Sequence, residues 1–281
     1  MEYVIGISTY KGANRIGWTL KSIGQMTGLF SVVVVDDGSP LSDFTETASI
    51  IQALKFPATL CRFPVNRGLS ATCNEILRHS EGRSVILLDD DALLPPNFLQ
   101  VLNCVFENKL AVAGFIGEKA IYGKAVEELE AGKGVPISGT DRPPEFTTEL
   151  SGFCFAINGN LVPLADPKTR FDNIYKHYFH DSDFCCQQAA KKLPSFKFYW
   201  PRIPHLEHAT MNAYEELKAE ESVKHDFHMF NLKWKGEAPH EKAKEFVSKI
   251  EFERLVFPTA LGMTRNSYPI YEERVLCQPK T

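Results

Sequence analysis

Apolar runs alternate with amphipathic stretches along the first 120 or so residues of the chain. The apolar runs end in small or acidic side chains and predict buried strands at 3–9, 31–40, 58–63, 84–91 and 110–117. Apolar residues at helical spacing predict helices at 12–27, 44–54, 66–77 and 95–108, with Ser70 as a candidate N-cap of the third helix. Strands that alternate with helices at this pace predict a mostly parallel sheet that helices cover on both faces.

The second half of the chain has a less regular pattern. Residues 118–148 are rich in Gly, Pro and Glu and predict a connection that contains one helix at 125–131. We expect a strand at 149–159, a helix that begins near Asp181, and a strand at 196–203. From residue 213 the pattern is mainly helical to about residue 256, so the predicted fold class is α/β with a mainly helical C-terminal extension.

Polar side chains gather where the predicted strands end. They are Ser8, Thr9, Asp36, Asp37, Asp89, Asp90 and Asp91. In open α/β sheets, ligands bind in the crevice outside the carboxyl ends of the strands. We therefore expect these side chains to converge on one binding crevice.

The run of three aspartates that begins at Asp89 demands an explanation, because neighbouring carboxylates repel each other and lose hydration when they are buried. Asp89 and Asp91 form a D-x-D pair whose side chains can face the same side of an extended segment. Mg²⁺ and similar hard cations bind one or two carboxylates together with substrate phosphate oxygens. The sequence thus leaves two interpretations: a divalent metal site, or an acidic loop that water solvates.

Two turns in the first half carry further candidate residues. Asp36 or Asp37, in the Asp-Asp-Gly-Ser turn, can accept hydrogen bonds from a ribose hydroxyl or a base N–H, or can simply cap a turn. Asn66 and Arg67 precede a glycine, and an arginine placed there can bind a phosphate through two hydrogen bonds. The alternative is an ordinary turn with a solvated arginine.

Two polar segments in the second half are candidates for catalysis and metal binding. In the segment His180 to Phe184, Asp181 suits the N-cap of a helix and Asp183 its first turn. Asp181 also suits a general base that accepts a hydroxyl proton. His205 and His208 follow the last predicted strand and suit either a polar turn or metal ligands.

Composition narrows the class of protein only a little. The chain has 281 residues, a formal net charge of −4 and 44% hydrophobic residues, as in an ordinary globular protein without an obligatory polyanionic partner. Its seven cysteines form no CxxC pair, which favours reduced thiols and a cytoplasmic location. The first residues do not have the pattern of a signal peptide, and no apolar run is long enough for a membrane span, so any membrane association is expected to be peripheral.

The order of the motifs, rather than any one of them, resembles the family 2 glycosyltransferases of the GT-A fold. The motifs are STYKGANRIGWTLKSI, VVVVDDGS, NRGLSATCNEIL, VILLDDDALLPP, SGFCFAI, HDSDFCCQ and HLEH. The resemblance covers about three quarters of the chain and is specific for the fold and the donor class, but not for the acceptor. It implies a GT-A domain at 1–210, with a nucleotide-sugar-binding half at 1–117 and an acceptor and catalytic half at 118–210, followed by the extension at 211–281.

The resemblance also implies roles for single residues. Donor-binding residues would be Ser8, Thr9, Tyr10, Asp36, Asp37, Asn66, Arg67, Asp89 and Asp90. Asp89 and Asp91 would hold Mn²⁺ or Mg²⁺, with His208 as the first choice and His205 as the second choice for a histidine ligand. Asp181 would be the catalytic base, with Asp183 as the alternative, because His180 stands where the family often has a glutamate.

The expected activity is metal-dependent, inverting transfer of a sugar from a nucleoside diphosphate sugar to an acceptor hydroxyl. The alternatives are a catalytically inactive nucleotide-sugar-binding protein and, as a poorer match, a nucleotidyltransferase. A glycan, a lipid-linked molecule and a hydroxylated base in DNA all remain open as acceptors. Residues 168–202 hold seven Lys or Arg against three Asp, which suits either an anionic acceptor or a solvated helix face.

Overall fold

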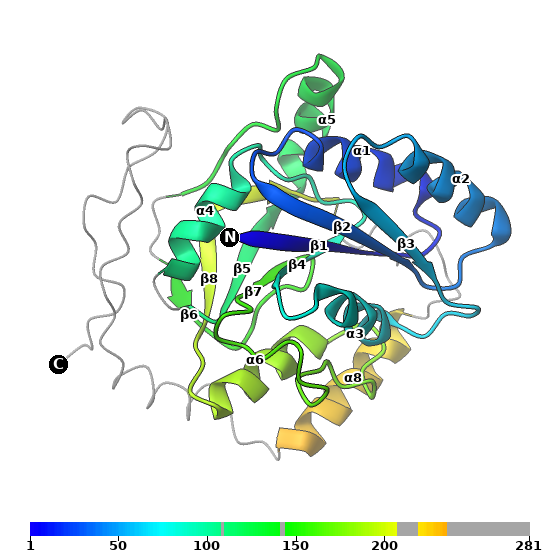
Figure 1. Cartoon of the computed structure of the whole chain (residues 1–281). Coiled ribbons are helices and arrows are strands. Elements are labelled where there is room, and N and C mark those ends of the chain that lie inside the picture. Colours follow the sequence, from blue (N-terminus) through cyan, green and yellow to red (C-terminus); the bar gives the residue numbers. More distant parts are fainter. Residues whose placement is uncertain (108–109, 141–143, 207–218, 235–281) are drawn as a thin grey trace.

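The computed structural model describes residues 1–107, 110–140, 144–206 and 219–234. Its centre is an eight-stranded sheet with the order β3-β2-β1-β4-β7-β5-β8-β6 (Figure 1). The strands are β1 (Glu2–Thr9), β2 (Leu29–Asp36), β3 (Ala58–Arg62), β4 (Ser84–Asp89), β5 (Val112–Glu118), β6 (Glu145–Phe146), β7 (Cys154–Ile157) and β8 (Ser195–Pro204).

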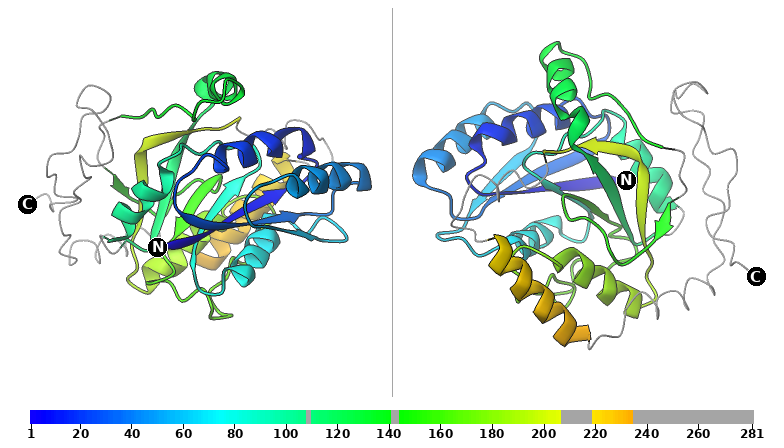
Figure 2. Two further views of the ribbon diagram at one scale, coloured as in Figure 1. Left: turned by 45° about the horizontal axis from the view of Figure 1, so that its top comes forward. Right: turned by 180° about the vertical axis from the view of Figure 1, so that it is seen from behind.

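The helices cover both faces of this sheet (Figure 2). They are α1 (Ala13–Ile23), α2 (Leu41–Gln52), α3 (Leu69–Ser80), α4 (Phe98–Glu107), α5 (Tyr122–Glu130), α6 (His180–Ala190) and α8 (Ala219–Trp234), with a short 3-10 turn, η1 (Lys119–Ile121), before α5. In the described part of the chain, no helix is both long and apolar enough to cross a lipid bilayer.

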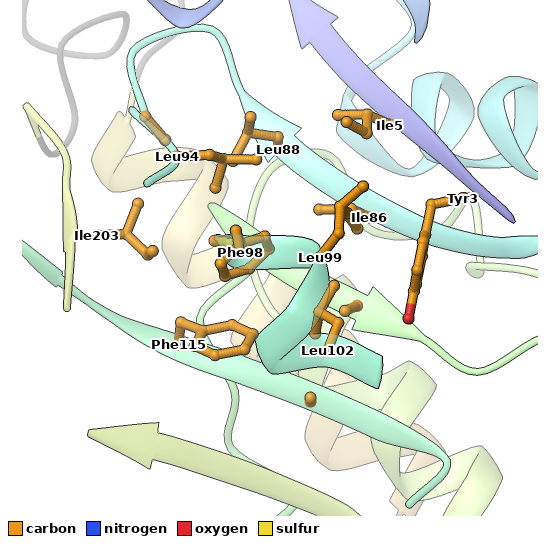
Figure 3. Packing of buried hydrophobic residues seen from close by; sticks show 14 of the residues in the cluster. Tyr3, Ile5, Ile86, Leu88, Leu94, Phe98, Leu99, Leu102, Phe115 and Ile203 are labelled. Carbon is orange, nitrogen blue, oxygen red and sulfur yellow. The ribbon is translucent and has the colours of Figure 1, made fainter. Parts of the chain in front are cut away.

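Alternation along the central strands divides the core into two layers. In β1, Ile5 and Ile7 pack with α1 and α4, whereas Val4 packs on the opposite face with α3 and α6. β2 and β4 alternate in the same way, because a strand that is covered on both faces must be apolar throughout. Figure 3 shows the first layer, in which Phe98 and its neighbours on α4 lie against β4.

The α/β fold is confirmed, but not all strands of the sheet are parallel. β3, β2, β1 and β4 are parallel neighbours, as are β5 and β8. β7 inserts between β4 and β5 and runs antiparallel to both, and the short β6 runs antiparallel to β8. The periodicity of apolar residues reports burial and not strand direction, so it could not separate these two arrangements.

The N-caps of two helices differ from the sequence prediction. Gly68, not Ser70, stands at the N-cap of α3, and the Ser70 hydroxyl instead donates to the carbonyl oxygen of Tyr175 at 3.0 Å. Phe179, not Asp181, is the N-cap of α6. The predicted C-terminal helix is described at 219–234 only, and the rest of it lies outside the described residues.

Candidate active site

The carboxyl ends of β1, β2 and β4 open into a cavity of about 550 Å³. Its walls come from both halves of the chain. The donor-side predictions that line it are Ser8, Thr9, Tyr10, Asp37, Asn66, Asp89, Asp90 and Asp91, and the later segments contribute Phe115 to Gly117, Ser151 to Phe153, His177 to Asp181, and His205. The expectation that the polar strand ends converge on one crevice is therefore confirmed for most of these residues, because parallel strands of similar length end at one edge.

Asp89, Asp91 and His205 form a cluster with the composition of a metal site. An isolated bridge between Ala92 and His205 brings the end of β8 beside the aspartate turn. The Nε2 atom of His205 lies 3.0 Å from an Asp91 oxygen and 3.5 Å from an Asp89 oxygen, and the three ligand atoms lie within 4.8 Å of one another. Two carboxylates and one imidazole form a donor set that fits Mn²⁺ or Mg²⁺.

The environment of His205 agrees with a cation at this point. Its ring stacks on Phe153 with the centroids 4.3 Å apart, which fixes the direction of Nε2. Burial alone would lower the pKa of His205, but the hydrogen bonds and negative charges of Asp89 and Asp91 outweigh burial and raise that pKa to about 9. The two carboxylates thus attract positive charge to the place where a metal would bind. His208, the first choice from the sequence, lies outside the described residues.

Asp90, in the middle of the aspartate run, has a different role from its neighbours. Its carboxylate accepts hydrogen bonds from Arg15 Nε at 3.0 Å and from the Thr9 hydroxyl at 2.6 Å. Arg15 and Asp90 are both buried, and burial raises the pKa of Asp90 to about 6 although Arg15 opposes the rise. This pair ties the aspartate turn to α1, so Asp90 supports the cavity wall although we had predicted it as a donor ligand.

The donor half separates the two aspartates that follow β2. Asp37 lines the cavity and accepts hydrogen bonds from the backbone N–H groups of Arg67 and Gly68 at 2.7 and 2.9 Å. Burial raises the pKa of Asp37 to about 6, whereas these two bonds lower it. Asp36 does not line the cavity, because its carboxylate turns back to accept the Ser39 N–H and lies 3.7 Å from Arg62.

The side chains of Asn66 and Arg67 also point in different directions. Asn66 lines the cavity, but the Arg67 guanidinium lies over the Phe63 ring, 4.6 Å from its centroid. Arg67 is therefore not among the described residues that line the cavity, and its contact with a phosphate stays a prediction. Gly68 has a φ of +88°, and a Cβ there would stand 2.7 Å from the carbonyl oxygen of Lys176, so a side chain at this position would collide with the acceptor half.

Asp181 faces the cavity from the first turn of α6. One of its oxygens accepts the Ser182 N–H at 2.7 Å. A Cβ on Gly152 would lie 3.3 Å from the other oxygen and 3.1 Å from Nε2 of His180, so the glycine lets the strand segment pass close to both side chains. Asp181 is thus available on the side of the cavity opposite the donor half.

Asp183, the alternative base, is placed elsewhere. Its carboxylate is fully buried and does not line the cavity. Four donors surround it: the Tyr175 hydroxyl at 3.2 Å, the Gln187 amide at 2.7 Å, the Lys233 ammonium at 2.9 Å and the Trp234 indole N–H at 2.9 Å. A carboxylate held by four donors has a structural role, so we no longer consider Asp183 as a base.

The sequence analysis did not assign several residues of the site. His177, Tyr178 and Phe179 form one wall of the cavity from an irregular segment, and their aromatic character was the signal available. Arg15, the partner of Asp90, lies inside an amphipathic helix, where a basic residue is usually solvated. None of the seven basic residues between 168 and 202 is among the residues that line the cavity.

Comparison with sequence families identifies the first half of the chain. Residues 4–130 match the sequence model of Glycosyl transferase family 2. Over this region the chain is similar to the family 2 glycosyltransferases. Two uncharacterized glycosyltransferases of Haemophilus influenzae are 30% identical to it, one over 120 residues (42% of this chain and 44% of the relative) and the other over 104 residues (36% and 34%). The match therefore spans less than half of the length of each of these relatives.

Solved structures show a similar fold over a longer part of the chain. Staphylococcus aureus TarS 1–349 superposes with a TM-score of 0.54 at 21% identity, covering 72% of this chain and 59% of TarS. The mannosyltransferase PcManGT of Pyrobaculum calidifontis, solved with GDP-Man and Mn²⁺, gives 0.51 at 18% identity, covering 70% and 56%. TarS has also been solved with UDP and with UDP-GlcNAc. At these identities the likeness shows the GT-A fold that the sequence predicts.

Proposed function

We propose that the protein transfers a sugar from a nucleoside diphosphate sugar to an acceptor hydroxyl with inversion of the anomeric configuration. One observation carries the proposal: the cavity has the Asp89, Asp91 and His205 cluster in its wall and also the Asp181 carboxylate, in a chain that is similar to the family 2 glycosyltransferases. A displacement needs a cation beside its leaving group and a carboxylate base beside its nucleophile.

On the donor side, Asp37 and Asn66 would bind the nucleoside, because they line the wall beside the ends of β1 and β2. Asp89, Asp91 and His205 would hold Mn²⁺ or Mg²⁺, which supplies positive charge to the departing diphosphate. No lysine or arginine stands among the described residues that line the cavity. The described wall therefore offers the departing diphosphate no lysine or arginine, which supports a role for a bound cation.

On the acceptor side, Asp181 would accept the hydroxyl proton while the oxygen attacks the anomeric carbon. The new carbon–oxygen bond forms on the face opposite the bond that breaks, and the nucleoside diphosphate leaves with the bonding electrons. The Asp183 carboxylate binds Lys233 and does not line the cavity. Of the two aspartates in the first turn of α6, Asp181 is the one that lines the cavity. A single displacement with one base inverts the configuration.

We further propose that the acceptor presents a neutral carbohydrate surface. The wall next to Asp181 consists of His177, Tyr178, Phe179 and His180. Aromatic rings suit the apolar faces of sugar rings, whereas an anionic acceptor such as DNA needs cationic contacts. The basic residues at 168–202 do not supply those contacts inside the cavity. The cytoplasmic location remains a prediction from the cysteine pattern.

The test begins with the donor site. Calorimetric titration of UDP, GDP, CDP and dTDP, each with and without Mn²⁺, is expected to show metal-dependent binding of one nucleotide. Asp91→Asn is expected to abolish the metal dependence, and Glu46→Gln is the matched control, because it removes one negative charge from an exposed position on α2. Absence of binding by all four nucleotides would contradict the proposal.

Turnover separates an enzyme from a protein that only binds nucleotide sugars. The wild type is expected to hydrolyse UDP-GlcNAc or GDP-mannose slowly to the nucleoside diphosphate and free sugar, with water in place of the acceptor. Asp181→Asn is expected to retain nucleotide binding and to lose this hydrolysis. Equal hydrolysis by wild type and Asp181→Asn would overturn the assignment of the base.

A further inference from the structure

The segment 176–179 forms one wall of the cavity but belongs to no helix or strand. Backbone N–H groups in an irregular segment need partners, since an unpaired buried donor is costly. Here the partner is one side chain, Asp226 of α8. Its carboxylate accepts the N–H groups of Lys176 at 3.0 Å, His177 at 2.9 Å and Tyr178 at 2.9 Å.

The surroundings of Asp226 stabilise its negative charge. Its side chain is fully buried, and Nδ1 of His225 lies 2.7 Å from its second oxygen. Burial would raise the pKa of Asp226, but the backbone donors and His225 hold that pKa below its usual value. Asp226 is therefore a buried carboxylate whose charge three consecutive N–H groups stabilise, and it lies about 50 residues away from them in the sequence.

The same segment is also held from the donor half. The carbonyl oxygen of Lys176 accepts the N–H of Leu69 at 2.9 Å, at the start of α3, next to Gly68. The wall thus lies between α3 on one side and α8 on the other. Its position relative to the donor site is fixed by contacts from both directions.

Phe179, the next residue, has a φ of +59°, which is a strained conformation for an aromatic residue. Its ring packs on Phe227 and Phe230 of α8, with centroid distances of 5.7 and 5.3 Å. Phe179 is the N-cap of α6, and its carbonyl oxygen accepts the Asp183 N–H at 2.8 Å. Helix α6 therefore begins, with Asp181 in its first turn, where α8 holds this strained residue.

A second anchor joins α8 to α6 directly. Lys233 and Trp234 of α8 donate to the buried carboxylate of Asp183, and α6 and α8 lie side by side (Figure 2). Asp226 and Lys233 are seven residues apart, which places them on the same face of a helix. Helix α8 therefore contacts both the cavity wall, through Asp226, and helix α6, through Lys233 and Trp234.

We propose that α8 is part of the catalytic unit, and that Asp226 is a positioning residue: it fixes the wall at 176–179 and, through Phe179, the orientation of Asp181 toward the donor. This inference rests on the proposed function. It assigns to the C-terminal extension a role in the reaction that the glycosyltransferase domain match at 4–130 does not reach.

The central variant is Asp226→Asn, which keeps the shape of the side chain but replaces one acceptor oxygen with a donor. Leu232→Ala is the matched control, because Leu232 lies on the same helix and is 58% exposed. Hydrogen exchange of peptides that cover 174–182 is expected to become about tenfold faster in Asp226→Asn, since loss of a charge-assisted hydrogen bond removes more than about 1.4 kcal/mol. Exchange in β1 is expected to stay unchanged in both variants.

The functional readout is the hydrolysis of UDP-GlcNAc, with GDP-mannose as the second probe. In this step water attacks the anomeric carbon, its proton passes to Asp181, and the bond to the diphosphate breaks. Asp226→Asn is expected to lower kcat about tenfold or more and to leave the affinity for UDP with Mn²⁺ within twofold of the wild type. Leu232→Ala is expected to match the wild type in both measurements.

The outcomes separate the two proposals. Faster exchange with unchanged kcat would show that Asp226 is merely structural and would overturn the positioning role. If the wild type neither binds nor hydrolyses any nucleotide sugar, the proposed function is wrong. Hydrogen exchange then still tests whether Asp226 holds the segment 176–179 in place. Should Asp226→Asn not fold, Trp234→Phe is the second variant. It removes the N–H to Asp183 together with part of the indole ring but keeps an aromatic side chain, and it is expected to lower kcat about threefold with UDP affinity unchanged. An unchanged kcat in that variant would overturn the role of α8.

Discussion

The donor half and the acceptor half of the cavity hold their carboxylates in different ways. In the donor half, Asp37 and Asp89 follow the ends of parallel strands, so the register of the sheet places them. In the acceptor half, Asp181 follows an irregular segment that α8 holds from a distance in the sequence. The donor site is thus a property of a regular scaffold, whereas the acceptor site depends on a few long-range hydrogen bonds. Changes of equal size are therefore expected to have different effects in the two halves.

The largest effect is expected at the base. Asp181→Asn should lower kcat for sugar transfer or for hydrolysis about 10³-fold, because general base catalysis contributes roughly 10²- to 10⁴-fold. The affinity for UDP with Mn²⁺ should stay within twofold, since Asp181 faces the acceptor side of the cavity. Steady-state kinetics and calorimetry on the same preparation check this. A large loss of UDP affinity would contradict the proposal that the donor and the acceptor bind on separate sides of the cavity.

The donor half should show its largest effect in stability. Arg15→Met removes the partner of the buried Asp90 carboxylate. An uncompensated buried charge costs about 3 kcal/mol or more. Protonation of Asp90 relieves part of this cost, because loss of Arg15 raises the pKa of Asp90 above the value of about 6 that it has beside Arg15. Urea denaturation at pH 7 is the measurement, and Lys55→Met, a change at an exposed position near β3, serves as the control. Equal stability of both variants would contradict a structural role for the pair.

A smaller effect is expected at the metal ligands. His205→Ala should weaken the Mn²⁺-dependent binding of the nucleotide about 100-fold while metal-independent binding remains, because one of three proposed ligands is lost. Titration of UDP at several Mn²⁺ concentrations separates the two contributions. A replacement that weakens binding equally with and without Mn²⁺ would argue that His205 contacts the nucleotide instead of the metal.

The smallest effect concerns pH. Burial raises the pKa of Asp37 to about 6 in the folded protein, above the ordinary value of an aspartate side chain. The stability that the protonated group contributes is therefore complete below about pH 4 and is lost as pH rises through about 6. Asp37→Asn should remove this loss, so the difference in unfolding free energy between variant and wild type should grow in favour of the variant from pH 4 to pH 7. Denaturation at several pH values checks the sign, and a constant difference would show that the Asp37 pKa is not raised.

The same contrast explains how much the sequence could predict. Strand ends such as Ser8-Thr9 and the aspartate run could be placed on one edge, because apolar periodicity and the geometry of parallel strands determine where they lie. The different environments of the three aspartates could not be predicted, since the Asp90 carboxylate binds Arg15 and Thr9, which lie 75 and 81 residues away in the sequence. The turn at Asp36 and Asp37 posed the same difficulty, because adjacent side chains point apart and only the fold decides which one faces the cavity.

In the acceptor half, local patterns were weaker guides. Asp181 and Asp183 are separated by one residue and both suit the first turn of a helix, so spacing alone left the base ambiguous. The tertiary contacts of Lys233 and Trp234 with Asp183 are the reason that we propose Asp181, and no local pattern in either segment predicts those contacts. The choice between His205 and His208 had the same origin, and the structure places His205 beside the aspartates.

The insertion of β7 between β4 and β5 has a consequence for biosynthesis. A nascent chain that has left the ribosome as far as residue 107 contains β4, but the outer edge of that strand has no partner until Cys154–Ile157 emerge. An open, apolar strand edge is a template for wrong pairing with other chains. A fragment that ends at residue 130 would therefore leave this edge of β4, near the centre of the sheet, without its partner strand.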